Sequence, residues 1–398
     1  MNDGDWPALA SMIARYRDTG KIANMQVMLG RGDQTLLLGG GADGFGEGAR
    51  ASDADSLYRV YSMTKPVVGM AVMMLIDEGK LGLDQPLPEI LPAFADMLVQ
   101  VEYDGSITAD NLEPARNPIT IRNMLTHTSG LGYAVVQQGP LSDAMKAAGV
   151  VTGLVGPDPA PGLARGTPVA TLEEFAERLA TMPLTHQPGT QWSYSTGLDL
   201  MGRVIEVVSG QDFESFLQER IFRPCGMENS FFRVPEDALD RMTVNYDVSG
   251  DTPQIVDGGE NTVYQGDGYF PMGGTGLVTS PHDYDRFLAM IANSGQIDGV
   301  QVLAEDAVVM GTSDLLPDPS VTDGSWVEGK AFGAAGQLGW AGLEHAYGWA
   351  GSAGTVAFVD RASGLRAAVF TQYMPASKWP VSDDFQAAIE ADLAAQAG

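Results

Sequence analysis

The sequence predicts an α/β fold: an antiparallel sheet flanked by helices, built from both ends of the chain. Two observations indicate it. Apolar, strand-like runs flank the turn-forming stretch Gly30-Arg31-Gly32-Asp33, and a second pair flanks Arg361-Ala362-Ser363-Gly364, so a hairpin is expected near each end. The middle of the chain, about residues 100–235, is mostly helix and loop.

This arrangement predicts two domains. Residues 1–98 and 236–398 are expected to form one α/β domain, and residues 99–235 a mainly helical domain inserted into it. No internal repeat or long linker is apparent in the sequence, so independent modules are not expected.

The elements follow from the spacing of apolar residues and from capping residues. A helix is expected over residues 6–17, and residues 149–168, rich in Gly and Pro, are expected to be a loop. Gly39, Gly41 and Gly44 match G-x-G-x-x-G, but only more glycine follows, so a loop is favoured over a dinucleotide site. Further helices are expected over residues 67–76, 118–125, 171–182, 198–208, 212–221, 281–293 and 383–395.

Composition excludes several classes of partner. The 398 residues carry a net charge of −28, so neither nucleic acid nor an anionic membrane surface is an expected partner. The single cysteine, Cys225, rules out an internal disulfide. The N-terminus is acidic and lacks the pattern of a secretory signal, and the longest apolar run, Val67–Ile76, is too short to span a bilayer. A cytoplasmic protein is therefore expected; the sequence leaves the oligomeric state open.

The chemistry is predicted to centre on Ser62 and Lys65. Residues three apart on a helix share one face, and of the six lysines only Lys65 has a serine three residues before it. A buried, neutral lysine can take the proton of a serine hydroxyl and make it a nucleophile. The start of a helix also favours developing negative charge. The alternative is that Ser62 only caps the helix.

Tyr194 is the candidate for a second activating group. It precedes the strongly periodic helix expected at residues 198–208, and a tyrosine beside a cationic lysine can share a proton with it. The alternative is a buried tyrosine with a satisfied hydroxyl.

A third group of candidates lies in residues 347–355. Small residues such as Gly351 allow the backbone to approach a ligand closely. The N–H groups of Ser62 and Ser352 are predicted to form an oxyanion hole. Trp349 is expected to form a wall of the acyl or alcohol pocket, with core packing as the alternative.

Other histidine and aromatic positions carry weaker predictions. Tyr133 is expected to reach the pocket from the helical domain, with surface packing as the alternative. His127 is interpreted as a C-terminal helix cap rather than a base. The four histidines are scattered and no H-E-x-x-H or G-x-S-x-G motif occurs, so no metal site or cofactor is predicted and an α/β-hydrolase is disfavoured.

Taken in order, these motifs resemble the serine β-lactamase-like superfamily: class C β-lactamases and, more closely, family VIII carboxylesterases. The resemblance runs from about Met25 to Tyr373 and implies a β-lactamase/transpeptidase-like fold. It implies Ser62 as nucleophile and Lys65 and Tyr194 as the proton-transfer pair. It is carried by Tyr61-Ser62-Met63-Thr64-Lys65, Leu125–Leu131, Pro188-Gly189-Thr190 with Tyr194, Gly273-Gly274-Thr275-Gly276 and Trp349-Ala350-Gly351.

Two departures favour the esterase branch of that superfamily. Class C β-lactamases usually have an asparagine where this chain has Thr196, and their third motif begins with lysine where this chain has Trp349. A lysine there binds the carboxylate of a β-lactam by charge, which Trp349 cannot do.

The resulting hypothesis is a serine carboxylesterase that hydrolyses short-chain acyl esters through an acyl-Ser62 intermediate, with a small-molecule ester as its partner. The alternatives on the same fold are a β-lactamase, a D-amino-acid amidase or peptidase, and an acyltransferase. A non-catalytic ligand-binding sensor is the alternative from another class.

Overall fold

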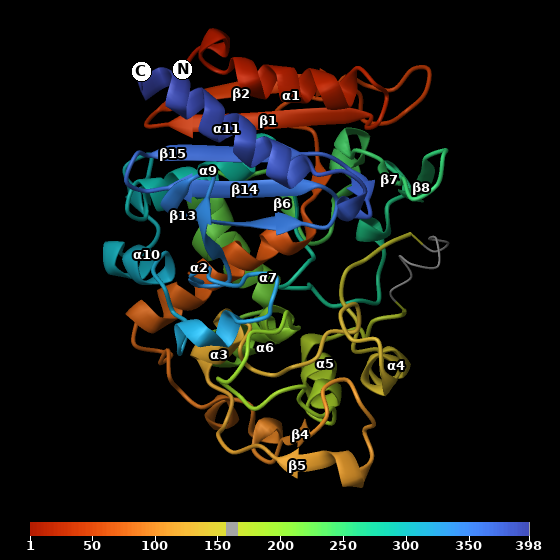
Figure 1. Cartoon of the computed structure of the whole chain (residues 1–398), viewed down its shortest axis with the longest axis vertical. Helices are drawn as coiled ribbons and strands as arrows, with labels where there is room; N and C mark the ends of the chain where they lie inside the picture. Colours follow the sequence, from red (N-terminus) through yellow and green to blue (C-terminus); the bar gives the residue numbers. More distant parts are fainter. Residues whose placement is uncertain (157–165, 398) are drawn as a thin grey trace.

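The computed structural model describes residues 1–156 and 166–397, and its largest element is a six-stranded antiparallel sheet (Figure 1). Its strand order is β12-β13-β14-β15-β1-β2, so strands from the two ends of the chain pair in one sheet, through β1 and β15. Both predicted hairpins are present, and the predicted α/β class is confirmed. The strands are β1 (Asn24–Arg31), β2 (Gln34–Gly41), β12 (Gln337–Trp340), β13 (Leu343–Gly351), β14 (Thr355–Asp360) and β15 (Leu365–Phe370).

Helices cover both faces of this sheet (Figure 1). On one face lie α1 (Pro7–Arg17) and α11 (Val381–Ala397), which pack against each other; Phe385 of α11 meets Phe358 of β14 with ring centres 6.0 Å apart. On the other face α9 (Pro281–Ala292) packs against β1, β14 and β15. Because the sheet is covered on both sides, every residue of β14 and β15 is buried.

The prediction of a loop for the glycine-rich stretch after residue 38 is wrong at its start, because β2 continues through Gly41. Gly39 and Gly41 pair with Gln26 and Asn24 of β1. A Cβ atom at Gly39 would lie 2.1 Å from the carbonyl oxygen of Met25, so only glycine permits this approach. The local glycine content indicated a loop, whereas pairing with a distant strand keeps the segment extended.

Helix α2 (Thr64–Asp77) forms the centre of the molecule, between the sheet and the helices of the middle segment (Figure 1). All of its residues from Thr64 to Leu75 are buried. Helix α10 (Glu305–Gly311) and helix α6 (Gly197–Ser209) pack against it. A helix enclosed in this way holds its first turn rigidly; Lys65 lies in that turn and Ser62 lies just before it.

Four helices of the middle segment lie at predicted positions with shifted ends, whereas the helix at residues 140–147 and the short helix at residues 223–225 were not predicted. The predicted helix over residues 118–125 begins only at Ile121, because the Thr120 side chain caps it. The helix predicted over residues 212–221 continues as a π-helical turn, Gln218–Phe222, into α8. The helices are α3 (Ile121–Leu125), α4 (Pro140–Ala147), α5 (Leu172–Leu179), α6 (Gly197–Ser209), α7 (Phe213–Leu217) and α8 (Arg223–Cys225).

The remaining strands form small sheets. The order β3-β9-β6 joins the strand before Ser62 to segments far along the chain, and β16-β7-β8 forms a second three-stranded sheet. These strands are β3 (Tyr58–Arg59), β4 (Leu98–Gln100), β5 (Leu112–Pro114), β6 (Ser230–Phe231), β7 (Asn245–Asp247), β8 (Gln254–Asp257), β9 (Val278–Thr279), β10 (Gln296–Ile297), β11 (Val300–Gln301) and β16 (Tyr373–Met374).

Three predictions remain to be placed against this architecture. In the predicted loop over residues 149–168, the described parts contain neither helix nor strand, and residues 157–165 lie outside the described residues. The division into two domains at residues 98/99 and 235/236 stays a prediction. Within residues 1–156 and 166–397, no helix has the length and apolar character needed to cross a membrane.

Candidate active site

Ser62 lies in a short 3₁₀ turn, Tyr61–Met63, between β3 and α2. Tyr61 has a φ of 41°, a left-handed conformation that is costly for a tyrosine and is found mostly where the surroundings impose it. The Thr64 hydroxyl donates to the Tyr61 carbonyl over 2.6 Å, and the Tyr284 hydroxyl donates to the Met63 carbonyl over 2.8 Å. The turn is thus held from both sides, and Ser62 is 8 % exposed.

Arg59, three residues before Ser62, anchors the approach to this turn. Its guanidinium is fully buried in an ion pair with Asp257 and also donates to the Thr243 carbonyl over 2.5 Å. The side-chain amide of Gln372 accepts from the Arg59 backbone N–H and donates to its carbonyl. Removing one partner of a buried pair leaves an uncompensated charge, so this anchor is expected to be sensitive to substitution.

Lys65 lies directly beside Ser62, as the spacing predicted. Its Nζ is 3.1 Å from the Ser62 Oγ and donates to the Gly274 carbonyl over 2.8 Å. Burial of the amine lowers the pKa of Lys65, while the nearby Tyr133 and Asp199 oppose this shift. A lysine with a lowered pKa reaches its neutral form nearer to physiological pH, and only that form can accept the serine proton.

Asp199 is a functional residue that the sequence analysis missed. It lies in the first turn of α6 and is buried; its Oδ1 accepts from the Gly274 N–H over 2.9 Å. The backbone of the single residue Gly274 thus links Asp199 to Lys65, through its N–H on one side and its carbonyl on the other, and a Cβ there would lie 2.5 Å from the Asp199 carboxylate. Burial raises the pKa of Asp199 to about 6, although the charge of Lys65 opposes this.

Tyr194 completes the group, because its side chain lies against both Ser62 and Lys65. The Lys65 Nζ is 4.6 Å from the centre of the Tyr194 ring. Burial raises the pKa of Tyr194, and hydrogen bonds with Ser62 and Trp349 act in the opposite direction. The structure therefore brings together the three predicted groups from two distant parts of the chain.

Trp349 lies near the end of β13 and contacts Tyr194 directly. Its Nε1 donates to the Tyr194 hydroxyl oxygen over 3.2 Å, and its ring is packed against Phe332 with centres 5.3 Å apart. Trp349 is 7 % exposed, so it combines core packing with a polar contact to the site.

Gly351 brings the end of β13 against the turn that carries Ser62. A Cβ on Gly351 would lie 2.2 Å from the Val60 carbonyl oxygen, so the close approach requires glycine. Ser352 follows immediately after this strand end. Its N–H as half of an oxyanion hole stays a prediction.

Tyr133 lies beside the same cluster. Its ring centre is 5.5 Å from that of Tyr194 and 6.0 Å from the Lys65 Nζ. Burial raises the pKa of Tyr133 to about 12, opposed by the charge of Lys65. Surface packing is excluded, because Tyr133 is 4 % exposed.

The side chain of His127 does not cap a helix, contrary to the interpretation from the sequence. The residue follows the end of α3 in a left-handed conformation with φ of 56°, but its imidazole is buried and its Nδ1 is 3.0 Å from the Ser195 Oγ. The ring packs against Tyr194 with centres 4.7 Å apart. Burial, with Lys65 nearby, lowers the pKa of His127 well below its usual value, so a neutral imidazole supports Tyr194 from behind.

Thr196 stands where related β-lactamases usually carry asparagine, and its hydroxyl donates to the Gly132 carbonyl over 3.0 Å. This bond ties the segment that carries Tyr194 to the segment that carries Tyr133. Thr196 therefore has a structural contact of its own in place of the amide. Among the described residues, no group of three His, Cys, Asp or Glu side chains is placed to hold a metal ion.

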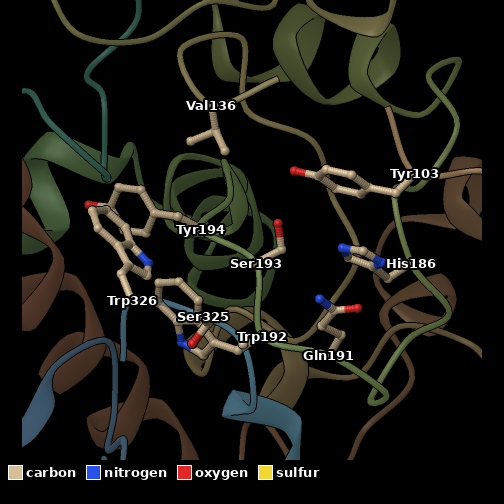
Figure 2. A pocket seen from close by; sticks show the side chains of 10 residues that line it. Tyr103, Val136, His186, Gln191, Trp192, Ser193, Tyr194, Ser325 and Trp326 are labelled. Atoms are coloured by element: carbon tan, nitrogen blue, oxygen red, sulfur yellow. The ribbon is translucent and has the colours of Figure 1, made fainter. Parts of the chain in front are cut away.

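A cavity of about 530 Å³ opens next to Tyr194 (Figure 2). Trp192 and Trp326 lie beside Tyr194 on one side, with Tyr103 and His186 across from them. The sequence analysis assigned none of these four residues. Trp326 is distant in the chain and lies in an irregular segment, so no local pattern could have associated it with Tyr194.

Comparison with known proteins supports the fold and the type of chemistry. The family model described as Beta-lactamase matches residues 9–391. Esterase EstB of Burkholderia gladioli is 32 % identical over 354 residues, covering 82 % of this chain and 79 % of that protein. The lovastatin esterase of Penicillium rubens is 29 % identical, covering 84 % of this chain and 82 % of that protein.

An uncharacterised protein of Mycobacterium tuberculosis is 34 % identical over 266 residues, and the match spans only 61 % of that relative's length. Among solved structures, EstCE1, described as a hydrolase with promiscuous acyltransferase activity, has a TM-score of 0.76 at 21 % identity, covering 96 % of this chain and 97 % of its own. Unliganded simvastatin synthase from Aspergillus terreus has a TM-score of 0.77 at 22 % identity, with full coverage of both chains. At these identities the structural likeness establishes the fold alone.

Proposed function

The chain belongs to the beta-lactamase family, and on that premise we propose that it is a serine carboxylesterase acting through an acyl-Ser62 intermediate. The observation that supports this most directly is the 3.1 Å contact between the Lys65 Nζ and the Ser62 Oγ, in a site where burial lowers the pKa of Lys65. Esterases among the relatives point the same way.

In the proposed first step the Ser62 Oγ attacks the ester carbonyl while neutral Lys65 accepts the hydroxyl proton. The carbonyl oxygen becomes negative and is stabilised by the N–H groups of Ser62 and Ser352. The C–O bond to the alcohol then breaks, and Tyr194 gives its proton to the leaving oxygen. Lys65, now protonated, then returns a proton to the phenolate of Tyr194, whose ring centre lies 4.6 Å from the Lys65 Nζ.

In the second step a water molecule attacks the acyl-Ser62 carbonyl and loses its proton to the Lys65–Tyr194 pair. The bond between the acyl carbon and the Ser62 Oγ breaks, and the serine recovers its hydroxyl proton. The carboxylic acid leaves, and the site returns to its starting protonation state. A preference for short acyl chains is part of this proposal.

The second candidate function is acyl transfer, in which an alcohol replaces water in the second step. The specific feature that favours it is the cavity beside Tyr194, where an acceptor alcohol has room to bind. Adding an alcohol to a hydrolysis reaction and quantifying the new ester against the free acid separates the two functions. Esters, D-amides and β-lactams in one substrate panel separate the amidase and β-lactamase alternatives.

A covalent label tests the proposed function. A fluorophosphonate probe is expected to add one equivalent to the wild-type chain, detected by intact mass, and none to Ser62→Ala. Ser11→Ala, an exposed serine on α1, is the matched control and should label like the wild type. An unlabelled wild-type chain would favour the non-catalytic sensor, and labelling of Ser62→Ala would refute the nucleophile assignment.

A further inference from the structure

The cavity beside Tyr194 has two aromatic walls. On one side Trp326 meets Tyr194 and Trp192 edge-on, with ring centres 5.2 Å and 5.6 Å apart. On the other side Tyr103 and His186 stack with centres 4.8 Å apart and planes 4° apart. Figure 2 shows the open space between these groups, with the Ser193 hydroxyl between them. Aromatic groups on both sides suit an aromatic ring as ligand.

Exposure of Trp326 points to a ligand as well. Its side chain is 70 % exposed at the edge of the cavity, the largest exposed fraction among the bulky apolar residues that the structure describes. An indole left in water next to a cavity has apolar surface to bury when a ring binds, and it loses few rotatable bonds in doing so.

The cavity lacks ionised side chains. Its lining consists of apolar, aromatic, hydroxyl and amide groups with glycine, and the only titratable group besides the phenols, His186, is neutral because burial lowers its pKa to about 4. The whole chain carries a net charge of −28, so a cavity of this size lined only by uncharged groups is distinct from the rest of the surface. It offers no ionised side chain to pair with a carboxylate or an ammonium group on a ligand.

We propose that this cavity binds a flat, uncharged ring system on the alcohol half of the ester. The assignment rests on the proposed function, in which Tyr194 protonates the leaving alcohol. Because Tyr194 both hydrogen-bonds with Ser62 and lines the cavity, we assign the cavity to the half of the ester that Tyr194 protonates. The volume of about 530 Å³ accommodates a two-ring system.

Two isomeric esters test which half enters the cavity: 2-naphthylmethyl acetate has the ring on the alcohol, and methyl 2-naphthylacetate has it on the acid. We expect the wild type to prefer the first by roughly tenfold or more in kcat/KM. Trp326→Ala should reduce that preference at least fivefold, whereas Trp326→Phe should retain most of it. Phe45→Ala, which removes an exposed aromatic side chain outside the cavity, should leave the preference at the wild-type value.

A binding measurement keeps the proposal testable if the proposed function fails. In calorimetric titrations, the Ser62→Ala variant should bind 2-naphthalenemethanol at least fivefold more tightly than the double variant that carries both Ser62→Ala and Trp326→Ala. Equal affinity in these two chains, or a wild type that prefers the acid-side isomer, would overturn the proposal. Binding that depends on Trp326 in a chain without esterase activity would refute the proposed function and leave the ring site supported.

Discussion

The Trp349 Nε1 donates to the Tyr194 hydroxyl oxygen across 3.2 Å. Trp349 stands where class C β-lactamases have a lysine, so this chain offers a neutral N–H to the phenol that we propose as the proton donor. This bond occupies one lone pair of the phenol oxygen and leaves its proton for Ser62. When Tyr194 gives that proton to a leaving alcohol, the same N–H stabilises the negative charge on the oxygen.

Trp349→Phe should therefore lower kcat for ethyl butyrate, whose leaving alcohol must be protonated, by roughly ten- to a hundredfold, since a hydrogen bond to a charged group is worth about 1.5–3 kcal/mol. The ring remains, but the donor is lost. Trp340→Phe is the matched control, because its Nε1 donates to the Gln337 carbonyl outside the site. Equal losses in the two variants would show that the Trp349 N–H has no particular role in the reaction.

Asp199→Asn should move the acidic limb of the kcat/KM profile to lower pH. The Asp199 carboxylate raises the pKa of Lys65 against the lowering effect of burial, so its removal lowers that pKa further. The asparagine oxygen can still accept from the Gly274 N–H. Asp360→Asn changes a buried carboxylate at the end of β14, outside the site, and should leave the pH of the acidic limb unchanged. A limb that moves to higher pH in Asp199→Asn would contradict the assignment of Lys65 as the base.

Asp199→Asn should also gain stability relative to the wild type as the pH rises. The pKa of Asp199 is raised from 3.8 to about 6 by folding, so the folded state favours its protonated form and loses stability as the pH rises through that range. The variant lacks this loss. In urea unfolding, the unfolding free energy of Asp199→Asn minus that of the wild type should be larger at pH 7 than at pH 4, by about 3 kcal/mol at most. A smaller difference at pH 7 than at pH 4 would mean that folding stabilises the ionised form of the Asp199 carboxylate.

Benzylpenicillin should be hydrolysed weakly or not at all. Its carboxylate requires a cation, and the third motif provides the neutral indole of Trp349 instead of a lysine ammonium. We expect kcat/KM for benzylpenicillin to lie at least about a thousandfold below that for p-nitrophenyl acetate, a difference of about 4 kcal/mol. Comparable turnover of the two substrates would show that the role of Trp349 has been misassigned.

Local sequence patterns predicted much of the fold and of the site. The two hairpins were predictable because strand and turn signals lie within about ten residues of each other. Ser62 and Lys65 could be paired because helical spacing alone sets their separation. Tyr194 could be placed at the start of α6 because a clear apolar period follows it.

The sequence failed where contacts between distant segments decide the outcome. The glycines at the end of β2 were predicted as a loop, yet pairing with β1 makes them strand. His127 lies after a helix end as predicted, yet its imidazole is buried against Tyr194 and does not act as a cap. Asp199 carries no local signal of function, because its raised pKa arises from burial beside Lys65.

The sequence by itself determined the fold class and predicted the serine, lysine and tyrosine that the structure brings together, since these follow from short-range periodicity and motif order. Only the tertiary structure decided that Asp199 lies behind Lys65, that Trp349 donates to Tyr194 and that Trp326 closes an aromatic cavity. Those three facts depend on distances and burial between residues up to 155 positions apart, and the packing that brings them together leaves no local pattern in the sequence.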